Sequence, residues 1–111
     1  MGRNRSVGQG DSMSLPLVFQ DKVKSDLRSS YRWYERQRHG LGEELLGEIH
    51  NCLDRIERDP ESLPVASVEA RFGLVQRFPF VVYFRVLVDR VEVLAIVHGR
   101  RKSRAWRSRL N

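Results

Sequence analysis

The sequence contains a single cysteine, Cys52, and no apolar run near the roughly 20 residues that a helix needs to cross a bilayer. One cysteine cannot form a disulfide within the chain, which excludes the bridged framework of small secreted domains. The first residues include arginines but lack the apolar segment of a secretory signal. We therefore expect a protein of the reducing cytoplasm with no membrane partner, no bound metal and no cofactor.

Acidic residues are scarce in the second half of the chain. Residues 61–111 carry ten Lys or Arg and four Asp or Glu, whereas residues 1–60 carry ten of each. Residues 99–109 alone hold six cations and no acid, which equals the whole net charge of +6. Such a cluster indicates contact with phosphates or with an acidic protein, although a solvated basic tail has the same composition. Most of these cations are arginines, whose forked guanidinium matches phosphate and carboxylate, and this favours recognition.

The chain divides into a tail and one domain. Residues 1–14 are rich in Gly, Ser, Asn and Gln without apolar periodicity, and they predict a flexible tail. The domain then covers residues 15–111, a length that suits a single hydrophobic core. Its first element is a short strand at 15–20, with Pro16 near the beginning, where a strand tolerates proline.

Two helices follow this strand. From Asp21 onward, apolar residues such as Val23 and Leu27 recur at helical spacing until Gly40 interrupts the pattern. A second apolar stripe begins at Leu41 and ends before Pro60, because proline disfavours a helical residue before it. Each helix has one apolar face, so the pair predicts an αα-hairpin that covers a sheet.

The rest of the chain has the composition of strands. A loop at 61–67 precedes three strand candidates, and the last two are separated by only two residues, which predicts a tight hairpin. A short helix can follow within residues 102–110. The predicted fold is α+β, in the order β-α-α-β-β-β, with the αα-hairpin packed on a small antiparallel-rich sheet and a short C-terminal helix. The strand candidates after the loop are residues 68–78, 80–88 and 91–98.

This order of elements resembles the RelE/ParE family, the toxins of bacterial type II toxin–antitoxin and plasmid stabilisation systems. The most specific stretches are "RFGLVQRFPFVVYFRV" at 71–86 and "VLAIVHGRRKSRAW" at 93–106, supported by "DLRSSYRWYERQRHGLG" at 26–42 and "IERDPESLP" at 56–64. The resemblance covers about residues 15–109. It implies a toxin that a cognate antitoxin, through an acidic tail, holds inactive.

The family has two branches with different targets. One branch cuts mRNA on the ribosome, and the ParE-like branch poisons DNA gyrase without a known need for nuclease chemistry. Cleavage by a 2′-hydroxyl needs an acid, a base and cations around the phosphate. For a ribonuclease the candidates are His98, Arg77 and Arg101, with Arg85 as a further cation, although His98 can equally be a strand-end imidazole bonded to the backbone.

One departure favours the ParE-like branch. The mRNA-cutting branch runs aromatic-Arg-aliphatic-aliphatic-Tyr in its central strand, whereas this chain has Val81 at the arginine position. Lysines are also missing from the preceding strand. We therefore expect a gyrase-directed toxin that is not an enzyme. An mRNA endoribonuclease and a non-toxic relative that binds nucleic acid or has a regulatory role remain the alternatives.

The residues expected to contact a partner or nucleic acid are mostly arginines on the last strands and the basic segment. Trp106 has two interpretations, packing of the terminal helix and stacking on a base. Trp33 fits helix packing, or a partner surface if it is exposed. The full set is Arg71, Arg77, Arg85, His98, Arg100, Arg101, Lys102, Arg104, Trp106 and Arg107.

Overall fold

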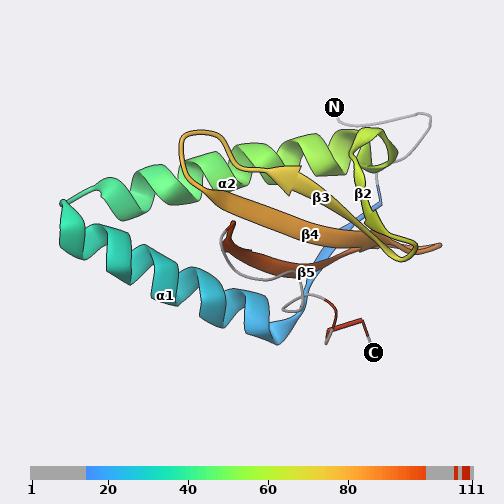
Figure 1. Ribbon diagram of the computed structural model, residues 1–111, viewed down its shortest axis with the longest axis horizontal. Helices are drawn as coiled ribbons and strands as arrows, with labels where there is room; N and C mark the ends of the chain where they lie inside the picture. The colour runs from blue at the N-terminus through green and yellow to red at the C-terminus, as the bar shows by residue number, and fades with distance from the viewer. Residues whose placement is uncertain (1–14, 100–106, 108, 111) are drawn as a thin grey trace.

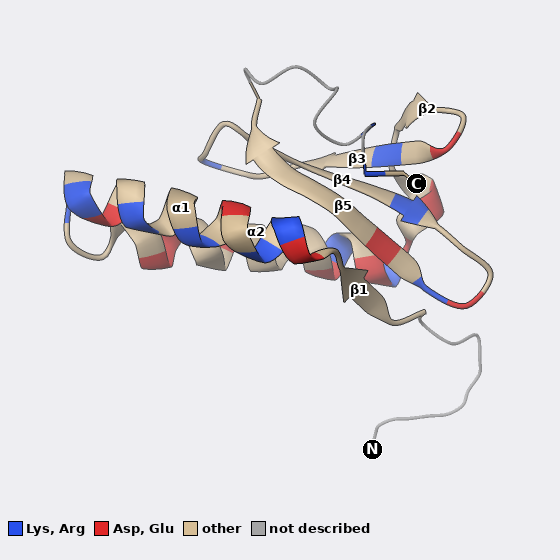
Figure 2. Cartoon of the chain, turned by 90° about the horizontal axis from the view of Figure 1, so that it is seen from below, with Lys and Arg blue, Asp and Glu red and all other residues tan. Residues whose placement is uncertain are grey.

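The computed structural model describes residues 15–99, 107, 109 and 110, and it has a layer of two helices against one sheet (Figures 1 and 2). The expectations of a tail at 1–14 and of a helix within 102–110 lie largely outside these residues, and of the latter segment only Arg107 is described as helical. In chain order the elements are β1 Leu17–Phe19, α1 Asp21–Gln37, α2 Leu41–Arg58, a 3-10 turn Pro60–Ser62, β2 Val65–Ser67, β3 Ala70–Leu74, β4 Phe80–Val86 and β5 Val91–His98.

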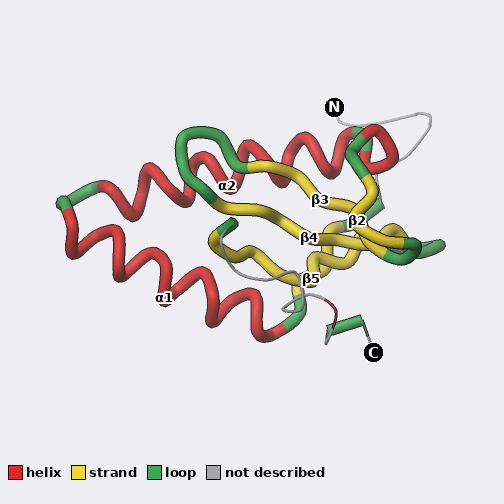
Figure 3. The backbone as a smooth tube through the Cα atoms, viewed as in Figure 1, coloured by secondary structure: helices red, strands yellow, loops and turns green. Residues whose placement is uncertain are grey.

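The two helices form the predicted hairpin, which Figure 3 shows beside the strands. Gly40 joins them in the left-handed region, with φ 91°, a conformation that glycine adopts without cost. The Glu35 carboxylate accepts hydrogen bonds from the backbone N–H groups of Gly40 and Gly42, at 2.9 and 3.0 Å. The bond from Gly40 is the main cause that lowers the pKa of Glu35. This carboxylate therefore fixes the angle at which α2 leaves α1.

The sheet has the strand order β1-β5-β4-β3-β2. β1 runs parallel to β5, and the other three pairs are antiparallel, so the sheet is antiparallel-rich, as predicted. The helices bury their apolar stripes on one face, where Val23, Leu45 and Ile56 meet Val82 and Phe84 with no side chain exposed. None of the helices in the described part of the chain is long and apolar enough to span a membrane.

Three details of the strand predictions are wrong. The stretch 61–67, expected as a loop, contains β2, which forms because it pairs with β3 and not through its own propensity. The predicted two-residue turn is a four-residue loop: Val86 pairs with Val91, and the Leu87 N–H donates to the Arg90 carbonyl at 2.8 Å. A two-residue turn needs positive φ, and the sequence offers no glycine there. β3 is also shorter than the predicted strand at 68–78.

Candidate functional site

The two faces of the sheet differ in what covers them. Val82 pairs with Gly73 and Ile96, and this row faces the helices, since a Cβ on Gly73 would lie 3.0 Å from the Cys52 Sγ. Side chains alternate along a strand, so Val81 and its partner Leu74 face the opposite side. Leu74 is 57% exposed there. The position where the mRNA-cutting branch carries an arginine is therefore on the face away from the helices.

His98 lies at the end of β5 on the helix-covered face. It pairs with Phe80 across the ladder, and the two rings meet edge to face with centroids 5.7 Å apart. With Asp26, Ser29 and Ser30 of α1 it lines a cavity of about 150 Å³. His98 also lines a second pocket, of about 330 Å³, together with Leu74 and Val81. It therefore borders both α1 and the surface that carries Val81.

The Phe80 ring links His98 to further aromatic contacts. Tyr34 of α1 meets Phe80 and Phe78, with centroids 6.0 and 5.3 Å apart. Trp33 meets Tyr34 edge to face at 4.9 Å and is itself 51% exposed. This ring contact is with the neighbouring residue of the same helix and is not packing between helices. The exposed indole leaves a partner surface as a prediction.

Arg77 is engaged by two carboxylates of α2. Its guanidinium donates to Glu44 at 2.8 Å and to Glu48 at 3.2 Å, and it lies 5.7 Å from the centre of the Phe78 ring. The bond to Glu44 is the main cause that raises the pKa of Arg77, and the same bond, with one from Arg38, lowers the pKa of Glu44. Arg77 adopts φ 69°, so these ion pairs hold a backbone conformation that disfavours non-glycine residues.

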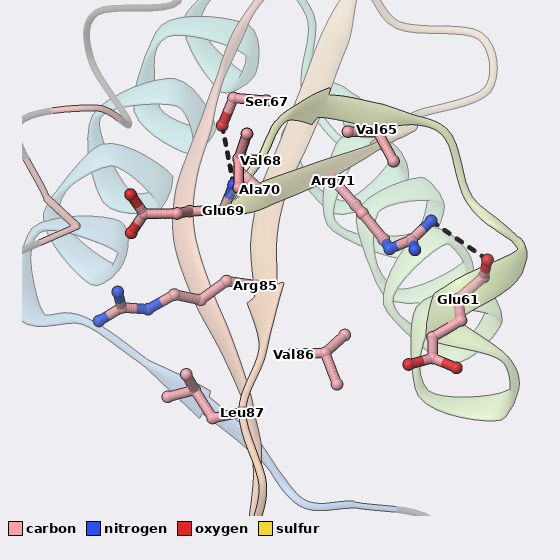
Figure 4. Close-up of a pocket in the computed structure, with 10 residues that line it drawn as sticks. All are labelled: Glu61, Val65, Ser67, Val68, Glu69, Ala70, Arg71, Arg85, Val86 and Leu87. Carbon is pink, nitrogen blue, oxygen red and sulfur yellow. Dashed lines mark hydrogen bonds between the residues drawn. The ribbon is translucent and has the colours of Figure 1, made fainter.

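Arg71 and Arg85 lie at the other end of the sheet and line one pocket (Figure 4). Their side chains do not converge. Arg71 is opposite Phe84 on the helix-covered face, and Arg85, one position further along β4, is on the other face. In Figure 4 the two guanidinium groups point away from each other. Arg85 donates from Nε to Glu92 at 2.7 Å. Burial alone would raise the pKa of Glu92, but hydrogen bonds from Arg85 and Gln20 outweigh it and lower that pKa.

The predicted site residues are therefore spread over the sheet. His98 pairs with Phe80, near one end of β4, and Arg85 lies toward the other end of the same strand. At roughly 3.3 Å per residue, about 17 Å separates Phe80 from Arg85. Arg107 is exposed. The other members of the set lie outside the described residues: Arg100, Arg101, Lys102, Arg104 and Trp106.

One cation of the basic segment has a structural role that sequence reasoning missed. Arg109 donates from Nη1 to the Asp26 carboxylate at 2.9 Å and to the Leu94 carbonyl at 3.1 Å. The Gln20 side chain donates to the Arg109 carbonyl at 2.6 Å. These bonds tie the end of the chain to α1 and β5, so Arg109 is occupied by the fold.

A groove between α1 and α2 was also missed. Its volume is about 520 Å³, and no described strand residue lines it, so it opens on the side of the hairpin away from the sheet. Leu27, Tyr31 and Leu46 supply its apolar lining. Three cations of α1, spaced four residues apart, also line it: Lys24, Arg28 and Arg32. Figure 2 shows the Lys and Arg positions of α1 as blue bands along the helix. This spacing is visible in the sequence, but it is equally typical of a solvated helix face.

Metal chemistry has no candidate site in the described residues, since they contain no group of three or more His, Cys, Asp or Glu side chains that could hold an ion. The cavities instead combine apolar walls with arginines and carboxylates. Such an arrangement can bind acidic or mixed protein segments.

Comparison with known proteins agrees with the predicted family. Residues 17–103 match the family model described as the ParE toxin of the type II toxin–antitoxin system parDE. No curated protein sequence matches the chain. A solved structure of the chromosomal ParDE system from P. aeruginosa has a TM-score of 0.68 and 18% identity, over 77% of this chain and 96% of that one.

A second solved structure shows the same fold. A mutant of the E. coli toxin RelE in the free state has a TM-score of 0.65 and 13% identity, over 88% of this chain and 96% of that one. The predicted α+β fold of two helices on a mixed sheet is thus confirmed, as is the type II toxin–antitoxin assignment, which implies an antitoxin partner. Since the family model covers most of the chain, the protein belongs to the ParE toxin family of type II toxin–antitoxin systems.

Proposed function

We propose that this toxin acts on DNA gyrase in the cytoplasm and does not cut mRNA. The observation that carries the proposal is the apolar character of the sheet face away from the helices. Val81 occupies the position where the resemblance places the arginine of the mRNA-cutting branch, and Leu74 and Phe72 lie on the same face in the neighbouring strand, where that branch often has lysines. A phosphorane forming there would meet no cation from these three positions, and such cations supply much of the rate in phosphate chemistry.

Purified gyrase tests this proposal directly. The toxin is expected to inhibit supercoiling by gyrase, and its induction is expected to cause growth arrest with filamentation and DNA damage signalling. Prior addition of the antitoxin, the product of the adjacent gene, should prevent the inhibition. Gyrase activity that is unchanged at toxin concentrations well above those in arrested cells would show that the target is different.

We also propose that the antitoxin binds the groove between α1 and α2 through an acidic amphipathic segment. Cations four residues apart on α1 lie about 6 Å apart along the helix, which matches acids at the same spacing on a second helix. Leu27, Tyr31 and Leu46 would receive the apolar side of that segment. Charge complementarity and the apolar lining together support a partner helix over a small anion.

Charge reversal at the rim tests the groove. Arg28→Glu is expected to weaken antitoxin binding about tenfold or more, because it places a like charge against the acidic segment. Arg58→Glu, an exposed reversal in the last turn of α2 that does not line the groove, is the matched control and should change affinity little. Calorimetry at increasing salt should show weaker binding of the unchanged chain. Equal affinities of the two variants would place the antitoxin elsewhere.

A further inference from the structure

Arg71 is held in place by neutral groups. Its Nη1 donates to the main-chain carbonyls of Glu61, at 3.2 Å, and Leu63, at 2.6 Å, and these two bonds use both Nη1 hydrogens. Among the described residues, no hydrogen-bond partner is found for Nε or Nη2, and no carboxylate forms an ion pair with this guanidinium. The charge is therefore fixed in position, and no residue in the described part of the chain neutralises it.

The pocket that Arg71 lines has aliphatic walls. Its volume is about 390 Å³, and Val65, Ala70, Val86 and Leu87 contribute to its lining beside Arg71 (Figure 4). Val65 is 58% exposed although it is a β-branched apolar residue of the edge strand β2. An aliphatic group in this pocket would therefore remove apolar surface from water while it lies next to a fixed cation.

We infer that this pocket binds one carboxylate carried on a short aliphatic group. Nε and Nη2 of Arg71, to which no described residue is bonded, form the side of the guanidinium that takes a carboxylate through two parallel hydrogen bonds. Glu61 and Glu69 also line the pocket, and their charges disfavour a polyanion such as a nucleic-acid backbone. A single carboxylate, neutralised by Arg71, meets much less of this repulsion.

The inference is independent of the toxin's target, and its test uses the full chain without any partner. Amide NMR spectra are recorded during titration with isovalerate, a branched aliphatic carboxylate, and with isovaleramide, which has the same shape without the charge. Isovalerate should give saturable shifts at Ala70, Arg71, Val86 and Leu87, and isovaleramide should give none. Equal shifts with both compounds would overturn the inference.

Two variants separate binding from folding. Arg71→Lys retains the charge but loses the planar fork, and it should weaken isovalerate binding about tenfold or more. Val65→Glu leaves the bonds of Arg71 to the carbonyls intact, replaces an exposed side chain, and should abolish binding by repulsion. Arg90→Gln removes one cation from the loop before β5, outside the pocket lining, and should leave binding unchanged. Unchanged binding in both Arg71→Lys and Val65→Glu would refute the site.

A parallel titration identifies the source of the carboxylate. The capped peptide acetyl-Val-Glu-Val-amide presents a carboxylate as a protein partner would, from a side chain beside aliphatic residues. Binding of the peptide with no response to isovalerate would assign the pocket to a partner protein, and the reverse would assign it to a small free acid. If neither probe produces shifts at the pocket residues, the inference is wrong.

Discussion

Transcripts mapped after induction of the toxin are expected to show no discrete cuts at ribosome positions, and His98→Ala is expected to leave growth arrest largely intact. The imidazole packs against the Phe80 ring beside α1, and His98 shares a second pocket with Val81, the position where the mRNA cutters carry an arginine. Val81 supplies no cation to a phosphate there. A general acid or base typically contributes about 10²–10⁴ in rate, so a catalytic His98 could not be removed without a large loss. Mapping of mRNA 5′ ends in both strains measures the outcome.

Two further variants make this comparison decisive. Charge reversal at both Arg100 and Arg101 is expected to abolish toxicity, because the basic segment is the part of the chain that we expect to meet the target. Reversal at Arg58, in the last turn of α2, is the matched control and should retain toxicity. Most single substitutions cost about 0.5–3 kcal/mol. The Phe80 contact of His98 falls in that range, so circular dichroism of His98→Ala is expected to match that of the unchanged chain. Ribosome-positioned cuts that vanish in His98→Ala would show that His98 is catalytic and that the toxin belongs with the mRNA cutters.

The elements of the fold could be predicted because each carries its own periodicity. The apolar stripe from Leu41 to Ile56 has helical spacing, and the run of β-branched and aromatic residues in β4 has the composition of a buried strand. β2 could not be predicted, since its three residues have no pattern of their own and pair only because β3 is adjacent. The length of the loop before Val91 could not be predicted, because apolar residues typical of a strand continue through Leu87 and Val88 after the pairing with β5 has ended.

The candidate site was harder to predict because it depends on register and on partners distant in sequence. Arg71 and Arg85 belong to strands that pair directly, yet they point in different directions, which only the positions of the ladder determine. The carboxylates that engage Arg77 come from α2, some 30 residues earlier in the chain. The sequence identifies all of these residues as cations. It cannot distinguish the cations that bond to other residues of the chain from those that could bind a partner.

Arg109→Leu is expected to destabilise the protein by roughly 3 kcal/mol, although it removes only one cation of the six in a basic segment. The Arg109 and Asp26 side chains are only 12% and 20% exposed, so the variant leaves a carboxylate without its partner in a poorly solvated position. It also removes a donor from the Leu94 carbonyl of β5. Denaturant unfolding of both chains, with the midpoint and slope compared, measures the difference.

Arg36→Leu is the matched control, since it removes the same charge from an exposed position in the last turn of α1 and should change the unfolding free energy by less than about 1 kcal/mol. A double variant with Asp26→Leu and Arg109→Leu should be more stable than the sum of the two single losses predicts, because neither group is then left unpaired. Additive losses would mean that the two side chains do not interact. In that case the end of the chain would be held to α1 and β5 by the Gln20 bond and by the packing of Leu110 on the sheet, and not by this ion pair.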